Sequence, residues 1–180
     1  VAFTIVSGFI TGSFMVYLST AQQIFEHQYN LAEEFPIIFA SLAIAIGLAT
    51  YLNSKLVMRF GMWRLSFLAI IAYVLISVLY IILFPKSNPS ITVLITFFAL
   101  QFFAIGFVFG NVRALALQPL GHIAGIGAAL NGFISTVMAV PIANYIGSFV
   151  KDSVLPLFIG FSVFGFLSFL VFLRMKLMRT

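Results

Sequence analysis

Six long apolar runs, each near the length needed to cross a lipid bilayer, take up almost the whole chain. A membrane-spanning helix needs ~20 mostly apolar residues to cross a hydrocarbon core ~30 Å thick. Short breaks rich in proline, glycine or charge separate the runs, which cover about residues 1–22, 35–52, 65–84, 91–115, 123–146 and 154–173. The sequence therefore predicts an all-α membrane protein, with six transmembrane helices in one bundle over residues 1–180.

The composition excludes most soluble functions. Hydrophobic residues make up 63% of the 180 positions and charged residues only 7%, whereas soluble proteins average about 45–50% and 25%. A water-soluble core of this size cannot bury such an excess. We therefore exclude a soluble enzyme, a nucleic-acid-binding protein and a disordered linker. The 23 phenylalanines are expected mainly to contact lipid, with a minority lining a pocket for apolar compounds.

The charged residues sort onto two sides when the loops between the runs are assigned alternately. One side receives no acid, and its basic residues are Lys55, Arg59, Arg64, Arg113, Arg174, Lys176 and Arg179. The other side receives Lys86 and Lys151 together with all four acids, Glu26, Glu33, Glu34 and Asp152. An excess of lysine and arginine marks the cytoplasmic side of a membrane protein. Both ends of the chain are therefore predicted to be cytoplasmic.

The chemistry that the sequence lacks narrows its function. The phosphate-binding pattern G-x-x-x-x-G-K-[ST] is absent, so we do not expect ATP hydrolysis. The chain has no cysteine, and His27 and His122 fall in loops on opposite sides, so no shared metal site is expected. No acidic or basic residue lies near the centre of a run, where proton-relay groups are usually found. We expect neither an enzyme nor a cofactor, and any proton-binding carboxylate must lie elsewhere.

Three classes of run recur in order along the chain. The first and fourth are polar and each contains G-F-x-x-G, at Gly8–Gly12 and at Gly106–Gly110. The second and fifth are rich in small residues, and the fifth carries the pairs Gly121/Gly125, Ala124/Ala128 and Ala128/Gly132, whose spacing lets helix backbones approach closely. The third and sixth are bulky and apolar all round, as expected of lipid-facing helices. This order predicts two three-helix repeats of inverted topology, a plan used by transporters.

Each polar residue within the runs allows two interpretations. Gln101, Asn131 and Asn144 either contact a substrate in a cavity or bond a neighbouring helix. Tyr17 either stacks on a ligand or anchors the helix at the membrane interface. Arg113 either belongs to a gate or extends its side chain to the interface. Pro141 is predicted to kink the fifth helix, as a hinge or as a fixed bend.

Two stretches carry a resemblance to a known family. The first begins Tyr17-Leu18-Ser19, continues with Phe25, Tyr29, Leu31, Phe35 and Phe39, and reaches Asn53 and Leu56-Val57-x-Arg59-Phe60-Gly61. The second is Asn111-x-x-Ala114-x-Ala116-Leu117-x-Pro119-Leu120-Gly121-x-x-Ala124-Gly125-x-x-Ala128-Ala129-Leu130-x-Gly132. Both resemble the C-terminal half of major facilitator superfamily transporters, specifically the drug:proton antiporters of the bicyclomycin/chloramphenicol-resistance group.

The resemblance implies one half of a twelve-helix fold in a bacterial inner membrane. Runs one and four would line the central cavity, two and five would pack against an N-terminal half, and three and six would face lipid. Arg59-Phe60-Gly61 stands where the family has D-R-x-G, but Met58 replaces the acid, and Met62 and Trp63 replace basic residues. The chain opens at Val1 inside an apolar run, so we expect it to be part of a longer protein, with the proton-binding acid in the N-terminal half.

The leading hypothesis is a proton-driven efflux transporter for small apolar or drug-like compounds, with the proton gradient as its energy source. We expect Tyr17, Ser19, Gln22, Gln101 and Asn111 in the substrate cavity, Arg59, Gly61 and Arg113 at the cytoplasmic gate, and Gly121, Gly125, Ala128 and Gly132 in helix packing. The bilayer, the N-terminal half and the substrate would be its partners. The alternative is a self-sufficient six-span protein, acting as a homo-oligomeric channel or as a membrane partner without transport. A third interpretation, which the sequence does not separate from these, is a transporter half that has lost transport and acts only as a sensor.

Overall fold

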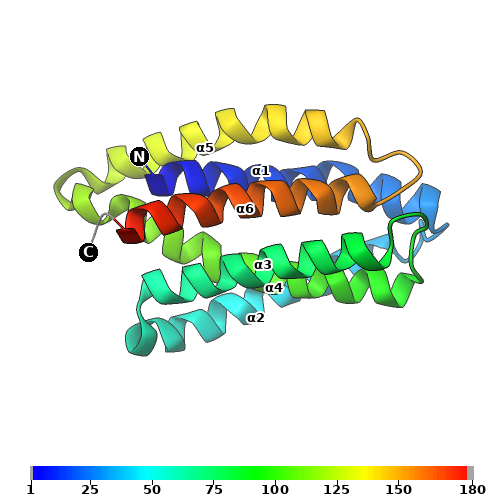
Figure 1. Ribbon diagram of the computed structural model, residues 1–180, viewed down its shortest axis with the longest axis horizontal. Helices are drawn as coiled ribbons and strands as arrows, with labels where there is room; N and C mark the ends of the chain where they lie inside the picture. The colour runs from blue at the N-terminus through cyan, green and yellow to red at the C-terminus, as the bar shows by residue number, and fades with distance from the viewer. Residues whose placement is uncertain (1, 178–180) are drawn as a thin grey trace.

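The computed structural model describes residues 2–177, and within that range the chain forms helices and no strand. The six α-helices are α1 (Ala2–Gln23), α2 (Phe35–Phe60), α3 (Met62–Leu83), α4 (Ile91–Leu117), α5 (Ala124–Gly147) and α6 (Leu155–Leu177). A π-helical turn, η1 (Ile24–Gln28), extends α1, and a 3-10 turn, η2 (Gln118–Ile123), joins α4 to α5 (Figure 1). Val1 and Arg179 lie outside the described residues.

Five uninterrupted helical stretches of the described chain are long and apolar enough to cross a membrane. One of them, Ile91–Gly147, has 57 residues because α4, η2 and α5 follow without a break. Leu120 in η2 leaves helical geometry (φ −110°, ψ 22°), and the chain doubles back there, so that α5 returns beside α1 (Figure 1). The prediction of an all-α protein whose helices are long and apolar enough to cross a membrane is confirmed for the described residues.

The helices extend beyond the apolar runs at the basic ends. The second run was expected to end at Leu52, but α2 continues to Phe60, and α6 continues past Leu173 to Leu177. Lysine and arginine are good helix formers and can hold their charge in the interface while the stem stays on the helix. The change in composition therefore marks the edge of the hydrocarbon core and not the end of the helix.

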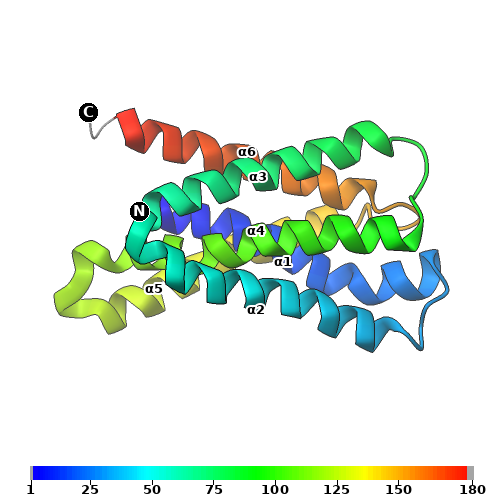
Figure 2. The ribbon, with the colours of Figure 1, turned by 90° about the horizontal axis from the view of Figure 1, so that it is seen from below.

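The helices form three layers, with α1 and α4 in the middle (Figure 2). α1 packs against α5, α6 and α4, while α4 packs against α2, α3 and α1, and α3 packs against α6. The contacts correspond when each helix number is raised by three and the count returns to α1 after α6. The α1–α5 contact then corresponds to α4–α2, and the α1–α6 contact corresponds to α4–α3. α1 and α4 start at opposite ends of the bundle (Figure 2). The principal contacts therefore describe two three-helix units of the same design that run in opposite directions.

Charges separate at the two ends of the bundle. The α2–α3 turn and η2 lie at the end where the chain begins, called here the basic end (Figure 2). It carries Lys55, Arg59, Arg64, Arg113, Arg174 and Lys176. The loops 29–34, 84–90 and 148–154 lie at the opposite end, called here the acid end, beside η1 with its Glu26. The sorting of charge that the loops predicted is therefore present in the fold.

Asn88 joins three segments at the acid end. Its Nδ2 donates to Gln28 Oε1 at 2.9 Å and to the Asp152 carbonyl at 3.3 Å, and its Oδ1 accepts the Val154 N–H at 3.0 Å. Gln28 in turn donates to the carbonyl of Lys151 at 3.0 Å. These bonds connect the end of α1 with the loops that precede α4 and α6. The side chain of Asn88 therefore links all three segments at the acid end.

Tyr29 adds a second link at this end. Its hydroxyl donates to the Pro89 carbonyl at 2.9 Å. Partial burial raises the pKa of Tyr29 from its ordinary value to about 12. The hydroxyl therefore stays protonated, and able to donate, throughout the physiological pH range.

We expect Asn88→Ala to lower the free energy of unfolding by about 1–3 kcal/mol, because it leaves three bonded groups of two other segments without their partner. The measurement is the thermal unfolding midpoint of the purified protein in detergent micelles. The exposed neighbour Ser87 provides the control, since Ser87→Ala should change stability by less than about 0.5 kcal/mol. Equal midpoints for the two variants would show that the Asn88 bonds do not stabilise the bundle.

Candidate functional site

Gly8, Gly12 and Gly106 of the two G-F-x-x-G sequences lie where α1 meets α5 and α4 meets α2, whereas Gly110 has nothing close to it. A Cβ atom added to Gly8 would lie 2.7 Å from Met138 Sδ, and one added to Gly12 would lie 2.9 Å from Ile142 Cδ1. A Cβ at Gly106 would lie 2.6 Å from Ala49 Cβ. The tight contacts thus occupy equivalent places in the two three-helix units. Close packing was expected from the small residues of the second and fifth runs, whereas the glycines at these contacts lie on the first and fourth.

The predicted packing residues of the fifth run face outward. Gly121, Gly125, Ala128 and Gly132 are exposed, and a Cβ atom at any of these glycines would meet nothing within 4 Å. α5 buries a different stripe, formed by Gly127, Asn131, Ser135, Ala139 and Ala143, and it meets α1 where Met138 and Ile142 lie against Gly8 and Gly12. None of these residues packs against another helix of this bundle, and their role in helix packing stays a prediction that concerns a partner outside it. Small residues would let the backbone of α5 approach another surface closely, but no helix of this bundle packs against these four.

α2 carries a similar exposed stripe. Its buried residues are only Leu42, Ala49 and Asn53. Small residues recur at spacings of three and four along another side of the helix, and all are exposed: Ala40, Ala43, Gly47, Thr50 and Ser54. We call these residues, together with Gly125, Ala128, Gly132 and Thr136 of α5, the small-residue stripes. All four outer helices also expose large apolar side chains, such as Leu75 of α3, Phe166 of α6, Ile44 of α2 and Phe133 of α5.

The residues expected in the substrate cavity are not brought together. Ser19 and Gln22 are exposed near the end of α1, where Gln22 Nε2 donates to Glu26 Oε1 at 2.9 Å. Tyr17 is 1% exposed and packs against Phe102, with ring centroids 4.6 Å apart, and parallel to Phe39 of α2 at 6.1 Å. Its ring therefore contacts the rings of its own bundle, and its hydroxyl has no hydrogen-bond partner.

Gln101 lies fully buried between α3 and α4. Its Nε2 donates to Ser77 Oγ at 2.6 Å and to the Tyr73 carbonyl at 3.2 Å. The Tyr73 hydroxyl approaches Gln101 and Ser13 without a hydrogen bond of good geometry, and Gln101 Oε1 has no partner. Of the two roles that the sequence allowed for Gln101, the structure provides the bond to a neighbouring helix.

The side chain of Asn111 also forms hydrogen bonds with a neighbouring helix. Asn53 of α2 and Asn111 of α4 exchange two amide hydrogen bonds, Asn53 Nδ2 to Asn111 Oδ1 at 3.0 Å and Asn111 Nδ2 to Asn53 Oδ1 at 2.7 Å. Both side chains are buried. The reciprocal pair satisfies two amides that would be costly to bury alone, and it fixes α2 to α4 near the basic end.

The predicted gate residues lie at the basic end. The Arg59 guanidinium is 5.3 Å from the Phe60 ring centroid, and that of Arg113 is 5.6 Å from the Phe109 centroid. Gly61 forms the turn between α2 and α3 with φ +79° and ψ +152°, a conformation essentially restricted to glycine. This backbone requirement explains glycine at position 61, and the gate role of all three residues stays a prediction.

Pro141 lies within α5, which continues as one helix from Ala124 to Gly147. The residue is exposed, so its ring does not disturb the α5 contact with α1. The kink expected there stays a prediction.

A pocket at the basic end contains an asparagine that the cavity prediction did not include. It has a volume of about 280 Å³ and lies between α1, η2 and α5, with Thr4, Ile5, Pro119, Leu120 and Asn131 among its lining residues. Asn131 is 6% exposed, and its Oδ1 has no hydrogen-bond partner. A mostly apolar pocket with one unpaired acceptor suits a small apolar molecule that carries one hydrogen-bond donor. The sequence offered Asn131 with two possible roles, and only the fold shows its unpaired oxygen beside a pocket.

No protein-family model, no curated protein and no solved structure matches this chain. The chain is therefore characterised by its own geometry: membrane-spanning helices in two oppositely directed three-helix units, exposed small-residue stripes, and a small apolar pocket at the basic end.

We expect Asn53→Leu or Asn111→Leu alone to lower the free energy of unfolding by about 1–2 kcal/mol, because each leaves a buried amide unpaired. The double variant should lose less than the sum, by about 1 kcal/mol, because no amide is then left without a partner. Unfolding in detergent of the four proteins of the cycle measures this coupling, and Asn144→Leu, at an exposed position of α5, is the control. Additive losses would show that the two side chains do not stabilise each other.

Proposed function

We propose that this chain is one six-helix half of a secondary transporter that works by alternating access. The observation that carries the proposal is the arrangement of the helix contacts, in which α1–α5 and α4–α2 correspond and α1–α6 and α4–α3 correspond. Transporters are commonly built from three-helix units of inverted topology. The close-approach glycines Gly8 and Gly106 support the same relation, because each lies in the same sequence pattern at an equivalent contact.

In this proposal the chain crosses the membrane six times, with its basic end in the cytoplasm. The chain doubles back at η2, so α4 and α5 would be separate spans. The excess of basic residues at the end that carries the α2–α3 turn supports the orientation. The location is a bacterial inner membrane, as the family resemblance implies.

The small-residue stripes would pack against a second six-helix unit. Small side chains allow helix backbones to approach closely in lipid, where the hydrophobic effect does not bring helices together. The large exposed side chains on α3 and α6 suit contact with lipid, and those on α2 and α5 suit contact with lipid or with an apolar partner beside the stripes. We propose that the second unit is the N-terminal half of the same protein and that it supplies the carboxylate for proton coupling, because the apolar runs of this chain have no ionisable residue near their centres.

The substrate class follows from the pocket at the basic end. We propose export of small, largely apolar compounds that carry an N–H or O–H donor, driven by the proton gradient. Asn131 Oδ1 would accept that hydrogen bond, and the surrounding apolar side chains would bind the rest of the molecule. A pocket open near the cytoplasmic side would load a compound for export.

The first test is the intact mass of the natural gene product, purified from its own membrane. We expect a mass of about twice 19.8 kDa, because the proposal requires a second six-helix unit in the same chain. A mass near 19.8 kDa would contradict this assignment and favour the alternative, in which the small-residue stripes associate with further copies of the chain in a channel or in a partner without transport.

The second test uses the natural gene product reconstituted in liposomes with an imposed proton gradient. Asn131→Leu should raise the KM for transported compounds with a donor group by about tenfold, which corresponds to the loss of one hydrogen bond. The KM for the matching compounds without the donor should stay the same. Asn144→Leu replaces an exposed amide on the same helix and is the control. Equal KM values for Asn131→Leu and the unaltered protein would remove this pocket from the transport path.

A further inference from the structure

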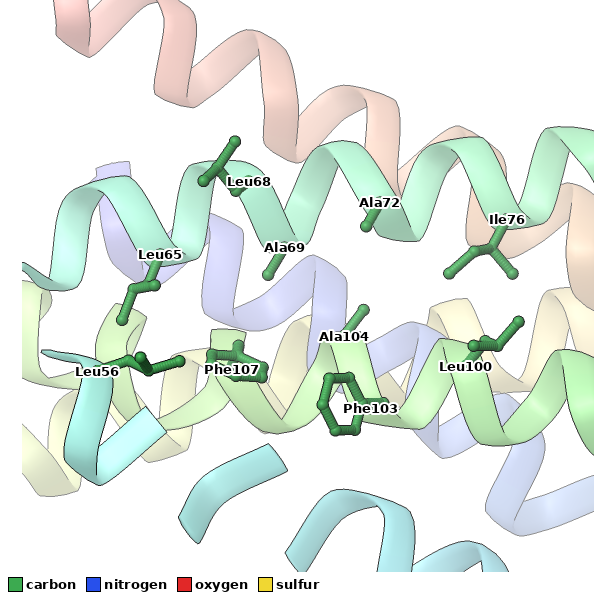
Figure 3. A pocket seen from close by; sticks show the side chains of 10 residues that line it. All are labelled: Leu56, Leu65, Leu68, Ala69, Ala72, Ile76, Leu100, Phe103, Ala104 and Phe107. Atoms are coloured by element: carbon green, nitrogen blue, oxygen red, sulfur yellow. The ribbon is translucent and has the colours of Figure 1, made fainter. Parts of the chain in front are cut away.

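A groove on the outside of the bundle runs between α3 and α4 (Figure 3). Its volume is about 370 Å³, and each of its lining residues is apolar. Leu65, Leu68 and Ile76 come from α3, Leu100 and Phe107 from α4, and Leu56 from the end of α2. Leu68 and Leu100 are 62% and 50% exposed, so the groove opens outward, toward the bilayer.

The length of the groove corresponds to one leaflet of a bilayer. Leu56 and Leu65 lie at one end of it, and Ile76 and Leu100 lie at the other (Figure 3). The separation from Leu65 to Ile76 along α3 is about 16 Å at the helical rise of ~1.5 Å per residue. Half of a hydrocarbon core of ~30 Å is about 15 Å. The groove therefore starts near the interface at the basic end and reaches about the middle of the membrane.

Arginines flank the end of the groove that lies at the interface. Arg64 directly precedes Leu65 and lies one helical turn before Leu68, while Arg59 lies one turn after Leu56. Both arginines are exposed. Gly61 makes the α2–α3 turn between them, and its glycine-restricted conformation places the end of one helix beside the start of the next. Two exposed arginines therefore lie within one helical turn of the residues that line this end of the groove.

Nothing acidic competes for these arginines at the basic end. The four acids of the chain belong to η1 and to the loops of the acid end. Guanidinium groups bind phosphate through paired hydrogen bonds, and anionic lipids enrich the cytoplasmic leaflet that basic residues face. The charge at this end of the groove thus complements a phosphate, and the groove complements a hydrocarbon chain.

We propose that this groove binds an anionic membrane phospholipid. One acyl chain lies along α3 and α4 between Leu65 and Ile76, and the phosphate lies between Arg59 and Arg64. The site is separate from the pocket that contains Asn131, and it depends on the chain being in a membrane but not on transport.

Native mass spectrometry of the purified protein tests the site. We expect phosphatidylglycerol to stay bound at collision energies that release phosphatidylcholine. The double variant Arg59→Gln/Arg64→Gln should bind phosphatidylglycerol about 25-fold more weakly, at about fivefold for each charge. The control Arg174→Gln/Lys176→Gln removes the same charge from α6 at the same end and should bind as the unaltered protein does. Equal losses in both double variants would overturn the site in favour of diffuse attraction to a positive surface.

A second variant tests the groove without any change of charge. Ala72 is an exposed groove residue, and Ala72→Trp should fill the groove and weaken binding of phosphatidylglycerol at least tenfold while circular dichroism stays the same. Inorganic phosphate at the same concentration should not raise the thermal unfolding midpoint, whereas phosphatidylglycerol should. Undiminished lipid binding by Ala72→Trp, or equal protection by phosphate alone, would overturn the role of the acyl chain.

Discussion

The fold depends on how helices attract one another in a solvent as apolar as their own side chains. Burying leucine against leucine gains little when lipid tails offer the same environment, so association depends on close packing and on interhelical hydrogen bonds. This chain uses both. Gly8 and Gly12 admit α5 to α1, Gly106 admits α2 to α4, and the Asn53–Asn111 pair fixes one of these contacts. The outer helices α2 and α5, which are rich in small residues, are therefore each attached to the bundle through one narrow stripe.

This economy of contact leaves surface for other partners. α2 and α5 each pack on the bundle through one stripe and leave the small-residue stripes exposed. α3 and α6 contact each other and expose bulky side chains. The two ends also differ in their links. Asn88 and Tyr29 join several segments at the acid end, whereas the basic end has the Asn53–Asn111 pair together with the Asn131 pocket and one end of the α3–α4 groove. The proposed export from the basic side agrees with this difference.

The sequence showed which helices carry polar residues, but it did not show which groups those residues bond. Gln101 and Asn111 were expected in a cavity because they lie on a polar run, yet both bond other helices of the same bundle, α3 and α2. The phenylalanines were expected mainly in lipid, yet rings such as Phe98, Phe102 and Phe158 pack around Tyr17 and Tyr80 in the core. A polar or aromatic side chain in an apolar run must find a favourable contact, and the run itself does not reveal which neighbouring helix provides it.

By itself, the sequence determined that the chain is helical, that it lies in a membrane and that its charges separate between two ends. These properties follow from run length, hydropathy and loop composition, because a backbone in lipid must bond within its own segment. The tertiary structure alone decided which face of each helix is buried. Gly106 and Gly132 look alike in the sequence, but one lies against α2 and the other is open. That choice depends on contacts between residues far apart in the chain, which the periodicity of a single helix does not encode.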